Sequence, residues 1–282
     1  MGATFVVTLR EAFEAALLLG LMYAYLDRVG ARAHYGWVTA GGALGLVASL
    51  IAGVGVSFAS GPLLDLGPDL VAAAVMFVAV ALLTWHGWWM RQHARALQSD
   101  LQRRIDDARA TQRLWIVGLV AFTGVFREGA ETVLFLWGLM SQTNVTGASG
   151  VAGGVLGILV AAGLGWAMFR GGRQLSSRGF FTTTSVLLLV VAAGLFSSGI
   201  GRLIGLGMLP ASAPLWDTSW VLGDDSLVGG FLSGLVGYRA RPGALEVLGY
   251  VAYLVVAGWL LFGPRSRVTV PAPVRSGADV GA

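Results

Sequence analysis

Residues 4–26 read TFVVTLREAFEAALLLGLMYAYL, an apolar stretch of membrane-spanning length that carries Arg10, Glu11 and Glu14 near its middle. About 20 predominantly apolar residues are needed for a helix to cross the hydrocarbon core of a bilayer. Six more stretches of this kind follow along the chain, at about 36–59, 68–90, 114–140, 150–170, 180–203 and 244–262. The sequence therefore predicts an all-α, polytopic membrane protein with seven transmembrane helices.

The composition of the chain also indicates a membrane protein. Of its 282 residues, 56% are hydrophobic and only 12% are charged, whereas soluble domains have about a quarter charged residues. The net charge of +4 rests on arginines that mostly lie in short loops, as membrane orientation requires, so we exclude a nucleic-acid partner. The chain has no cysteine, which excludes disulfides, thiolate metal sites and iron–sulfur clusters.

The distribution of arginines sets the orientation, because cytoplasmic loops carry an excess of basic residues. Arg239 and Arg241 would lie outside if the N-terminus is outside, with Arg202 at a boundary. The remaining loop and tail arginines would then lie inside: Arg28, Arg32, Arg91, Arg95, Arg103, Arg104, Arg109, Arg113, Arg170, Arg173, Arg178, Arg265, Arg267 and Arg275. We therefore predict that the N-terminus is outside and the C-terminus inside.

Two five-residue motifs concentrate the charge of the predicted spans. Arg10-Glu11-Ala12-Phe13-Glu14 lies in the first span, and Arg127-Glu128-Gly129-Ala130-Glu131 lies in the fourth. A charge inside hydrocarbon costs at least about 2.5 kcal/mol on insertion scales and marks a functional site by default. Residues three and four apart share a helix face. Each motif therefore presents two carboxylates and one guanidinium together, toward the interior of the bundle.

The two motifs are expected to meet in the middle of the bilayer. At 1.5 Å per residue, Glu14 lies ~16 Å below the outer start of its span and Glu131 ~15 Å below the outer end of its own, in a core ~30 Å thick. Three spans separate the motifs, so the motif helices run in opposite directions and the first six spans form a 3+3 inverted repeat with one extra helix. Such repeats place a transport site at the midplane.

The residue types in the motifs favour a hard cation. We predict that Glu11, Glu14, Glu128 and Glu131 ligate a metal ion, with Arg10 and Arg127 in support, because carboxylate oxygens suit such ions. The six charges sum to −2, and no histidine lies near the estimated depth, which argues against a soft-metal site. We expect protons and the cation to compete for the carboxylates. A purely structural role is disfavoured, since two surplus carboxylates would serve it poorly in lipid.

The paired motifs resemble those of the oxidase-dependent iron permease family, which includes fungal high-affinity iron permeases and bacterial EfeU-type permeases. The family signature is Arg-Glu-Gly-Leu-Glu, from which this chain departs only at the non-ionisable positions Ala12, Phe13 and Ala130. The resemblance covers nearly the whole chain. Before the last span it continues in Trp216-Asp217-Thr218-Ser219, Asp225-Ser226 and Gly237-Tyr238 followed by Pro242.

This resemblance implies a function and partners. It implies import of iron across the cell (inner) membrane by a multi-pass protein, with the six charged motif residues as the permeation site. Iron would be the substrate, and no permanently bound cofactor is implied. Delivery would involve an exoplasmic partner: a multicopper ferroxidase in fungi, or a periplasmic iron-binding protein and a haem peroxidase in bacteria. The lack of cysteine and the short tails fit the bacterial branch better.

The predicted organisation is a transmembrane permease domain, residues 1–264, followed by a disordered cytoplasmic tail, residues 265–282. Residues 226–237 form an apolar run too short to span, which favours a re-entrant or interfacial segment. Residues 91–113 read either as a cytoplasmic amphipathic helix or, as we favour, a solvated connector. The parts of the domain are repeat 1 (about 4–90), repeat 2 (about 114–203), an outer segment (204–243) and helix 7 (about 244–262).

Five further residues are candidates for the ion's path. Asp217, Asp224 and Asp225 lie in the outer segment and either capture incoming metal or serve as ordinary loop carboxylates. Glu246 opens the last span, where a carboxylate suits the helix N-terminus, a role that we favour over one in the path. For His86 we favour an interfacial position among tryptophans over the role of an exit ligand.

Other classes of function stay open at this point. The nearest is a permease of the same architecture for another divalent metal, such as lead or manganese. An intramembrane enzyme that uses the carboxylates for acid–base chemistry is disfavoured, because no nucleophile pairs with a base and no phosphate-binding loop is present. A non-transporting assembly subunit is the third alternative. We expect a transporter and not an enzyme.

Overall fold

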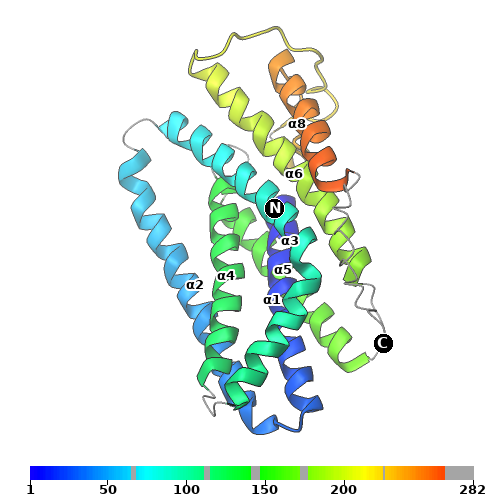
Figure 1. Cartoon of the computed structure of the whole chain (residues 1–282). Coiled ribbons are helices and arrows are strands. Elements are labelled where there is room, and N and C mark those ends of the chain that lie inside the picture. Colours follow the sequence, from blue (N-terminus) through cyan, green and yellow to red (C-terminus); the bar gives the residue numbers. More distant parts are fainter. Residues whose placement is uncertain (65–67, 111–114, 141–146, 172–176, 225, 264–282) are drawn as a thin grey trace, which may run out of the picture.

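The computed structural model describes all residues except 65–67, 111–114, 141–146, 172–176, 225 and 264–282, and its ordered elements are helices (Figure 1). Asp225 and the predicted tail lie outside the described residues. The elements are α1 (Gly2–Arg28), η1 (Arg32–His34), α2 (Tyr35–Leu64), α3 (Pro68–Ala110), α4 (Trp115–Met140), α5 (Gly147–Gly171), α6 (Ser177–Gly205), α7 (Leu227–Val236) and α8 (Ala244–Phe262).

Every predicted span coincides with one helix, and the one large difference concerns α3. The sequence predicted that the third span ends near residue 90 and that a separate segment follows. The apolar span does end there, at Met90, but the helix does not: α3 continues to Ala110, because residues 91–110 contain no Gly or Pro and many good helix formers. The extension also packs: Ile105 is fully buried, and Asp106 accepts a hydrogen bond from Tyr25 at the end of α1. Residues 91–110 are therefore helical, as in the other reading that the sequence left open, and residues 111–113 lie outside the described residues.

Among the described residues, five helical segments are long and apolar enough to cross a membrane: Arg32–Val56, Asp69–Met90, Gly147–Ala167, Phe181–Gly205 and Ala244–Phe262. The chain is thus a polytopic membrane protein. The motif helices α1 and α4 have comparable length but are not among the five, since the charges of the motifs lie in their middle. Their crossing, and with it the total of seven, stays a prediction.

The helices pack in pairs, and glycines bring their backbones together. In Figure 1, α4 lies between α1 and α2; α2 packs along α4, α1 along α5, α3 along α6, and α8 on α6. Gly45 of α2 lies against the backbone of Phe122 and Phe126 in α4, and Gly157 of α5 lies against the backbone of α1. Small residues allow such close approach between membrane helices.

Two buried apolar clusters lie on either side of the motifs. The first joins Val7 of α1 to Phe135 of α4, together with residues of α3 and α6. The second joins Met22 of α1 to Val117 of α4, together with Ile105 from the extension of α3. The clusters pair the start of α1 with the end of α4 and the end of α1 with the start of α4, so the two helices are antiparallel. The motifs lie between the clusters on both helices.

The segment between α6 and α8 contains the short helix α7. Ser226 caps it, since its Oγ accepts a hydrogen bond from the Gly229 amide at 2.9 Å, and Gly237 ends it with a left-handed φ of 71°. With 10 residues, α7 is too short to span a bilayer, as the sequence predicted. It packs against α6 and α1.

Candidate metal site

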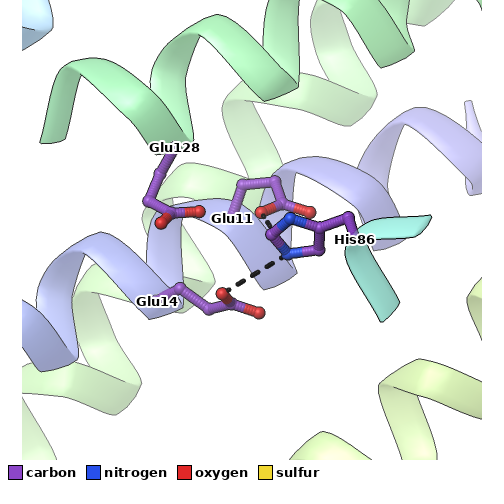
Figure 2. A group of neighbouring side chains, drawn as sticks. All are labelled: Glu11, Glu14, His86 and Glu128. Carbon is purple, nitrogen blue, oxygen red and sulfur yellow. Dashed lines mark ion pairs between the residues drawn. The ribbon is translucent and has the colours of Figure 1, made fainter. Parts of the chain in front are cut away.

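The two motifs come together in the structure, as the sequence predicted. Glu11 and Glu14 of α1, Glu128 of α4 and His86 of α3 each offer one ligand atom, and these four atoms all lie within 4.8 Å of one another. Figure 2 shows His86 and Glu128 facing the two α1 carboxylates across a common centre. We call Glu11, Glu14, His86 and Glu128 the buried cluster.

Each arginine binds the second glutamate of its own motif. Arg10 Nε donates to Glu14 Oε1 at 2.9 Å, and Arg127 Nε donates to Glu131 Oε1 at 3.0 Å. These pairs follow from the i, i+4 spacing.

The first glutamate of each motif is held less tightly. Arg10 Nη1 lies 3.9 Å from Glu11 Oε1, and Arg127 Nε lies 3.8 Å from Glu128 Oε1. Both distances are longer than a hydrogen bond. The two motifs therefore have the same internal contacts: the arginine forms a hydrogen bond with the second glutamate and none with the first.

The two motifs differ in exposure. The side chain of Glu11 is 0% exposed, whereas those of Arg127 and Glu131 are 35% and 22% exposed. The latter two line a cavity of about 300 Å³ between α3 and α4, and the Arg127 guanidinium lies 4.4 Å from the ring centroid of Trp89 there. The cluster is therefore sealed on the α1 side and adjoins a cavity on the α4 side. The cavity is lined by Leu82, Trp85, His86, Trp89, Arg127, Glu131, Leu134 and Phe135.

His86 is the functional candidate that sequence reasoning misplaced. The prediction that no histidine lies near the motifs was wrong, and so was the favoured interfacial position. The imidazole is buried, and its Nε2 lies 3.8 Å from Glu11 Oε2 and 3.6 Å from Glu14 Oε2, while its Nδ1 pairs with Glu131 Oε2.

The error has a geometric cause. The residue number of His86 within its span indicates a position near the inner surface only if all spans begin at one level, but the first turns of α3 lie above the N-terminus of α1 in Figure 1. The available signal was that a histidine sits inside an apolar stretch, where ionisable residues mark function.

The buried cluster contains polar atoms without hydrogen-bond partners among the residues that the structure describes. They are both carboxylate oxygens of Glu11, Oε2 of Glu14, Oε2 of Glu128 and Nε2 of His86. Burying such atoms unpaired is costly, and most buried polar atoms in proteins have a partner. Three carboxylates and one imidazole nitrogen that converge in this way form a donor set suited to a transition-metal cation.

The described acids of the outer segment already have protein partners. Asp217 accepts hydrogen bonds from the amide and hydroxyl of Ser219 and from Arg241. These bonds lower the pKa of Asp217 to about 2. Asp224 Oδ1 accepts from the amide of Ala240 at 2.9 Å. Both carboxylates therefore hold the segment in shape, and their role in metal capture stays a prediction.

Glu246 lies at the start of α8, as predicted. Its Oε2 accepts a hydrogen bond from the Gly243 amide at 2.7 Å, and its Oε1 lies 2.9 Å from Arg239 Nη1. The favoured reading as a helix-capping carboxylate is confirmed.

Fold and site together define a multi-pass membrane protein built around a buried group of carboxylates. The chain belongs to the Iron permease FTR1 family, which it matches over residues 1–266. It is therefore a permease of the cell membrane, the inner membrane in bacteria, and the resemblance seen in the motifs is confirmed.

Several proteins named Ferrous iron permease EfeU are similar to the chain over nearly its whole length. That of Yersinia pestis is 33% identical over 267 residues, which cover 94% of each chain. That of Yersinia pseudotuberculosis serotype I is 33% identical over 263 residues, 92% of each chain. That of Escherichia coli O6:K15:H31 is 32% identical over 260 residues, 91% of this chain and 94% of the relative. No solved structure matches the chain significantly.

Proposed function

We propose that this chain imports ferrous iron across the cell membrane and that the carboxylates of its two motifs bind the ion near the middle of the bilayer. Membership of an iron permease family and similarity to proteins named as ferrous iron permeases support iron as the substrate. The observation that carries the site is the convergence of Glu11, Glu14, His86 and Glu128, whose ligand atoms lie within 4.8 Å of one another.

The charge of the motifs supports a divalent ion. Four ionised glutamates and two arginines sum to −2, and a neutral imidazole adds nothing. A divalent cation would bring the total to zero, whereas a trivalent cation would leave a surplus positive charge in a region of low dielectric, where uncompensated charge is costly. An inside-negative potential would favour inward movement by about 4.6 kcal/mol per 100 mV for a divalent ion.

The packing supports alternating access. The buried cluster lies between two apolar clusters that join α1 to α4 on either side of it along these helices, while the cavity beside Arg127 and Glu131 adjoins it from the α4 side. Loosening one apolar cluster at a time would open the site first to the outside and then to the cytoplasm. Transporters with inverted repeats work by such movements of one half against the other.

The pairing of helices supports the inverted repeat itself. If α1–α3 and α4–α6 are the two halves, α1 packs along the second helix of the other half, α5, and α4 packs along α2 in the same way. The glycines at these contacts also correspond, with Gly41 and Gly45 in α2 matching Gly153 and Gly157 in α5. We propose on this basis an inverted repeat within a bundle of seven crossing helices. The distribution of arginines supports an outer N-terminus and an inner C-terminus.

Two expectations of the sequence enter the proposal unchanged. One is an exoplasmic partner, either an iron-binding protein with a peroxidase or a ferroxidase. The other is initial capture of iron by the acids of the outer segment. Lead or manganese is the alternative cargo to be tested, because carboxylates bind divalent ions broadly.

Uptake of radioactive iron(II) into proteoliposomes tests the proposal. Glu11→Gln and Glu128→Gln keep the size of each side chain but remove its charge, and we expect uptake to fall to background while each variant remains folded in detergent. The matched control is Asp27→Asn at the exposed end of α1, which should transport normally. Iron(III), manganese and lead are compared side by side. Full iron(II) uptake by both glutamine variants would reject the site.

A further inference from the structure

We propose that His86 ligates the transported ion through Nε2 and that Glu131 is the residue that positions it. The inference rests on the proposed function and refines it: Glu11, Glu14 and Glu128 remain ligands, whereas Glu131 acts through the histidine. The two motifs, alike in sequence, would then have different roles at the site.

The two ring nitrogens of His86 have different surroundings. Nδ1 pairs with Glu131 Oε2. Nε2 faces Glu11 and Glu14 across the cluster, and Figure 2 shows these two contacts as dashed lines. In metal sites, a ligating histidine nearly always donates its other ring N–H to a carboxylate, which fixes the tautomer and the orientation of the ring. With the ring proton on Nδ1, next to the paired Glu131 carboxylate, the lone pair of Nε2 would be directed at the three remaining glutamates.

The distances suit shared ligation of one ion. Nε2 lies 3.8 Å from Glu11 Oε2 and 3.6 Å from Glu14 Oε2, which is too long for a hydrogen bond. Two ligand atoms that each lie about 2.1 Å from one metal ion are roughly 3.0–4.2 Å apart. Nε2 also has no hydrogen-bond partner among the described residues. The side chain of His86 is only 4% exposed.

Glu131 is itself held in place from the other side. Its Oε1 accepts from Arg127 Nε at 3.0 Å, and the Arg127 guanidinium lies over the ring of Trp89, 4.4 Å from the centroid. Trp89 and His86 both belong to α3. A connected chain of contacts from Trp89 through Arg127 and Glu131 therefore fixes the imidazole, whereas Glu14, which Arg10 holds in the same way, faces Nε2 across the cluster.

A nitrogen ligand has a consequence for selectivity. Carboxylate oxygens alone suit magnesium, calcium and manganese, whereas imidazole suits iron, zinc, copper and nickel. His86 would thus favour ferrous iron over manganese and over the abundant hard divalent ions. Selectivity would come from a residue outside the two motifs.

X-ray absorption at the iron edge of purified, iron(II)-loaded protein tests the ligand. We expect the outer-shell scattering of an imidazole in the wild-type protein, its loss in His86→Gln, and its retention in His34→Gln, the matched control in η1. Iron bound by oxygen ligands alone in the wild-type protein would overturn the inference and leave the proposed function standing. Failure of the wild-type protein to bind or transport iron would overturn both.

Selectivity of uptake tests the positioning role. In proteoliposomes, His86→Gln should lower the ratio of iron(II) to manganese(II) uptake at least about 10-fold, and Glu131→Gln should weaken iron(II) binding about 10- to 100-fold, as loss of an outer carboxylate does. A residue with only a structural role would lower both metals equally. An unchanged iron-to-manganese ratio in both variants would contradict the proposal, and the wild-type absorption spectrum decides the case even if a variant fails to fold.

Discussion

Gly41 of α2 lies directly against the backbone carbonyl of Gly118 in α4, so closely that a Cβ on Gly41 would overlap the carbonyl oxygen and carbon. A backbone group cannot move aside as a flexible side chain can. The same relation recurs in the other half of the bundle, where a Cβ on Gly157 of α5 would lie 2.8 Å from the Leu9 amide nitrogen and the Phe5 carbonyl oxygen of α1. These contacts hold each motif helix against its neighbour.

Alanine at Gly41 is therefore expected to destabilise the bundle by about 1–3 kcal/mol, the usual cost of overpacking. The matched control is Gly55→Ala in the same helix, where nothing lies within 4 Å of the added Cβ. Thermal unfolding in detergent should show a lower midpoint for Gly41→Ala and no loss for Gly55→Ala. Equal behaviour of the two variants would argue against the packing described here.

The corresponding contact between α5 and α1 should respond in the same way. We expect Gly157→Ala to lower stability and iron uptake together, because it pushes α5 away from the motif helix α1. Gly163→Ala, six residues further along α5 and with open space around its Cβ, should leave both unchanged. Uptake and unfolding are measured on the same preparations, and a neutral Gly157→Ala would count against the α1–α5 contact.

The two motif arginines should differ in their contribution to stability. The Arg10 side chain is 3% exposed, and Arg127 is 35% exposed at a cavity. Removing one partner of a buried ion pair costs about 3–5 kcal/mol, because it leaves an uncompensated buried charge. Arg10→Gln should therefore unfold at a clearly lower temperature than Arg127→Gln in metal-free detergent solution, and equal losses would show that burial is not what separates them.

The contact between Arg127 and Trp89 should be worth about 0.5–2 kcal/mol, the range for a cation over an aromatic face. We expect Trp89→Leu to lower the apparent affinity for iron(II) several-fold, because Arg127 and Glu131 lose their support. Trp89→Phe keeps a ring and should recover much of the loss. Titration of iron(II) uptake gives the comparison, and equal affinities for the Leu and Phe variants would contradict a role for the ring.

The outer segment should be insensitive to pH over the physiological range. Hydrogen bonds from Ser219 and Arg241 lower the pKa of Asp217 to about 2. A carboxylate whose pKa is lowered in the folded state stabilises that state at pH values above its unfolded pKa of about 3.9. This stabilisation is lost as the pH falls toward 2. Hydrogen exchange at the Ser219 amide should therefore stay slow and level from about pH 5 to pH 8 once the intrinsic pH dependence is removed.

Asp217→Asn is the matching variant for that prediction. It removes the charge that Arg241 contacts at 2.9 Å, so exchange at Ser219 should quicken. If uptake of iron(II) also falls at low iron concentration but not at saturation, the carboxylate has the capturing role that the sequence suggested. Unchanged exchange in the variant would show that these hydrogen bonds do not organise the segment.

The helices could be predicted from the sequence because the membrane leaves the backbone few choices. A chain in hydrocarbon must satisfy its amide groups internally, so an apolar stretch such as residues 114–140 becomes a helix, observed as Trp115–Met140. The helical extension of α3 was only the less favoured of two readings, because a change from apolar to charged side chains marks the membrane surface and does not by itself end a helix. Nothing between residues 91 and 110 stops one.

By itself, the sequence determined the class of protein and the two motifs, since local spacing sets which residues share a helix face: Arg10 with Glu14, and Arg127 with Glu131. Only the tertiary structure decided that His86 completes the cluster and that Glu131 binds the histidine while Glu14 faces the centre. The relative height and tilt of α1, α3 and α4 decide those contacts. They follow from how glycines and apolar side chains of distant segments pack. The spacing of residues within one helix holds no information about that packing.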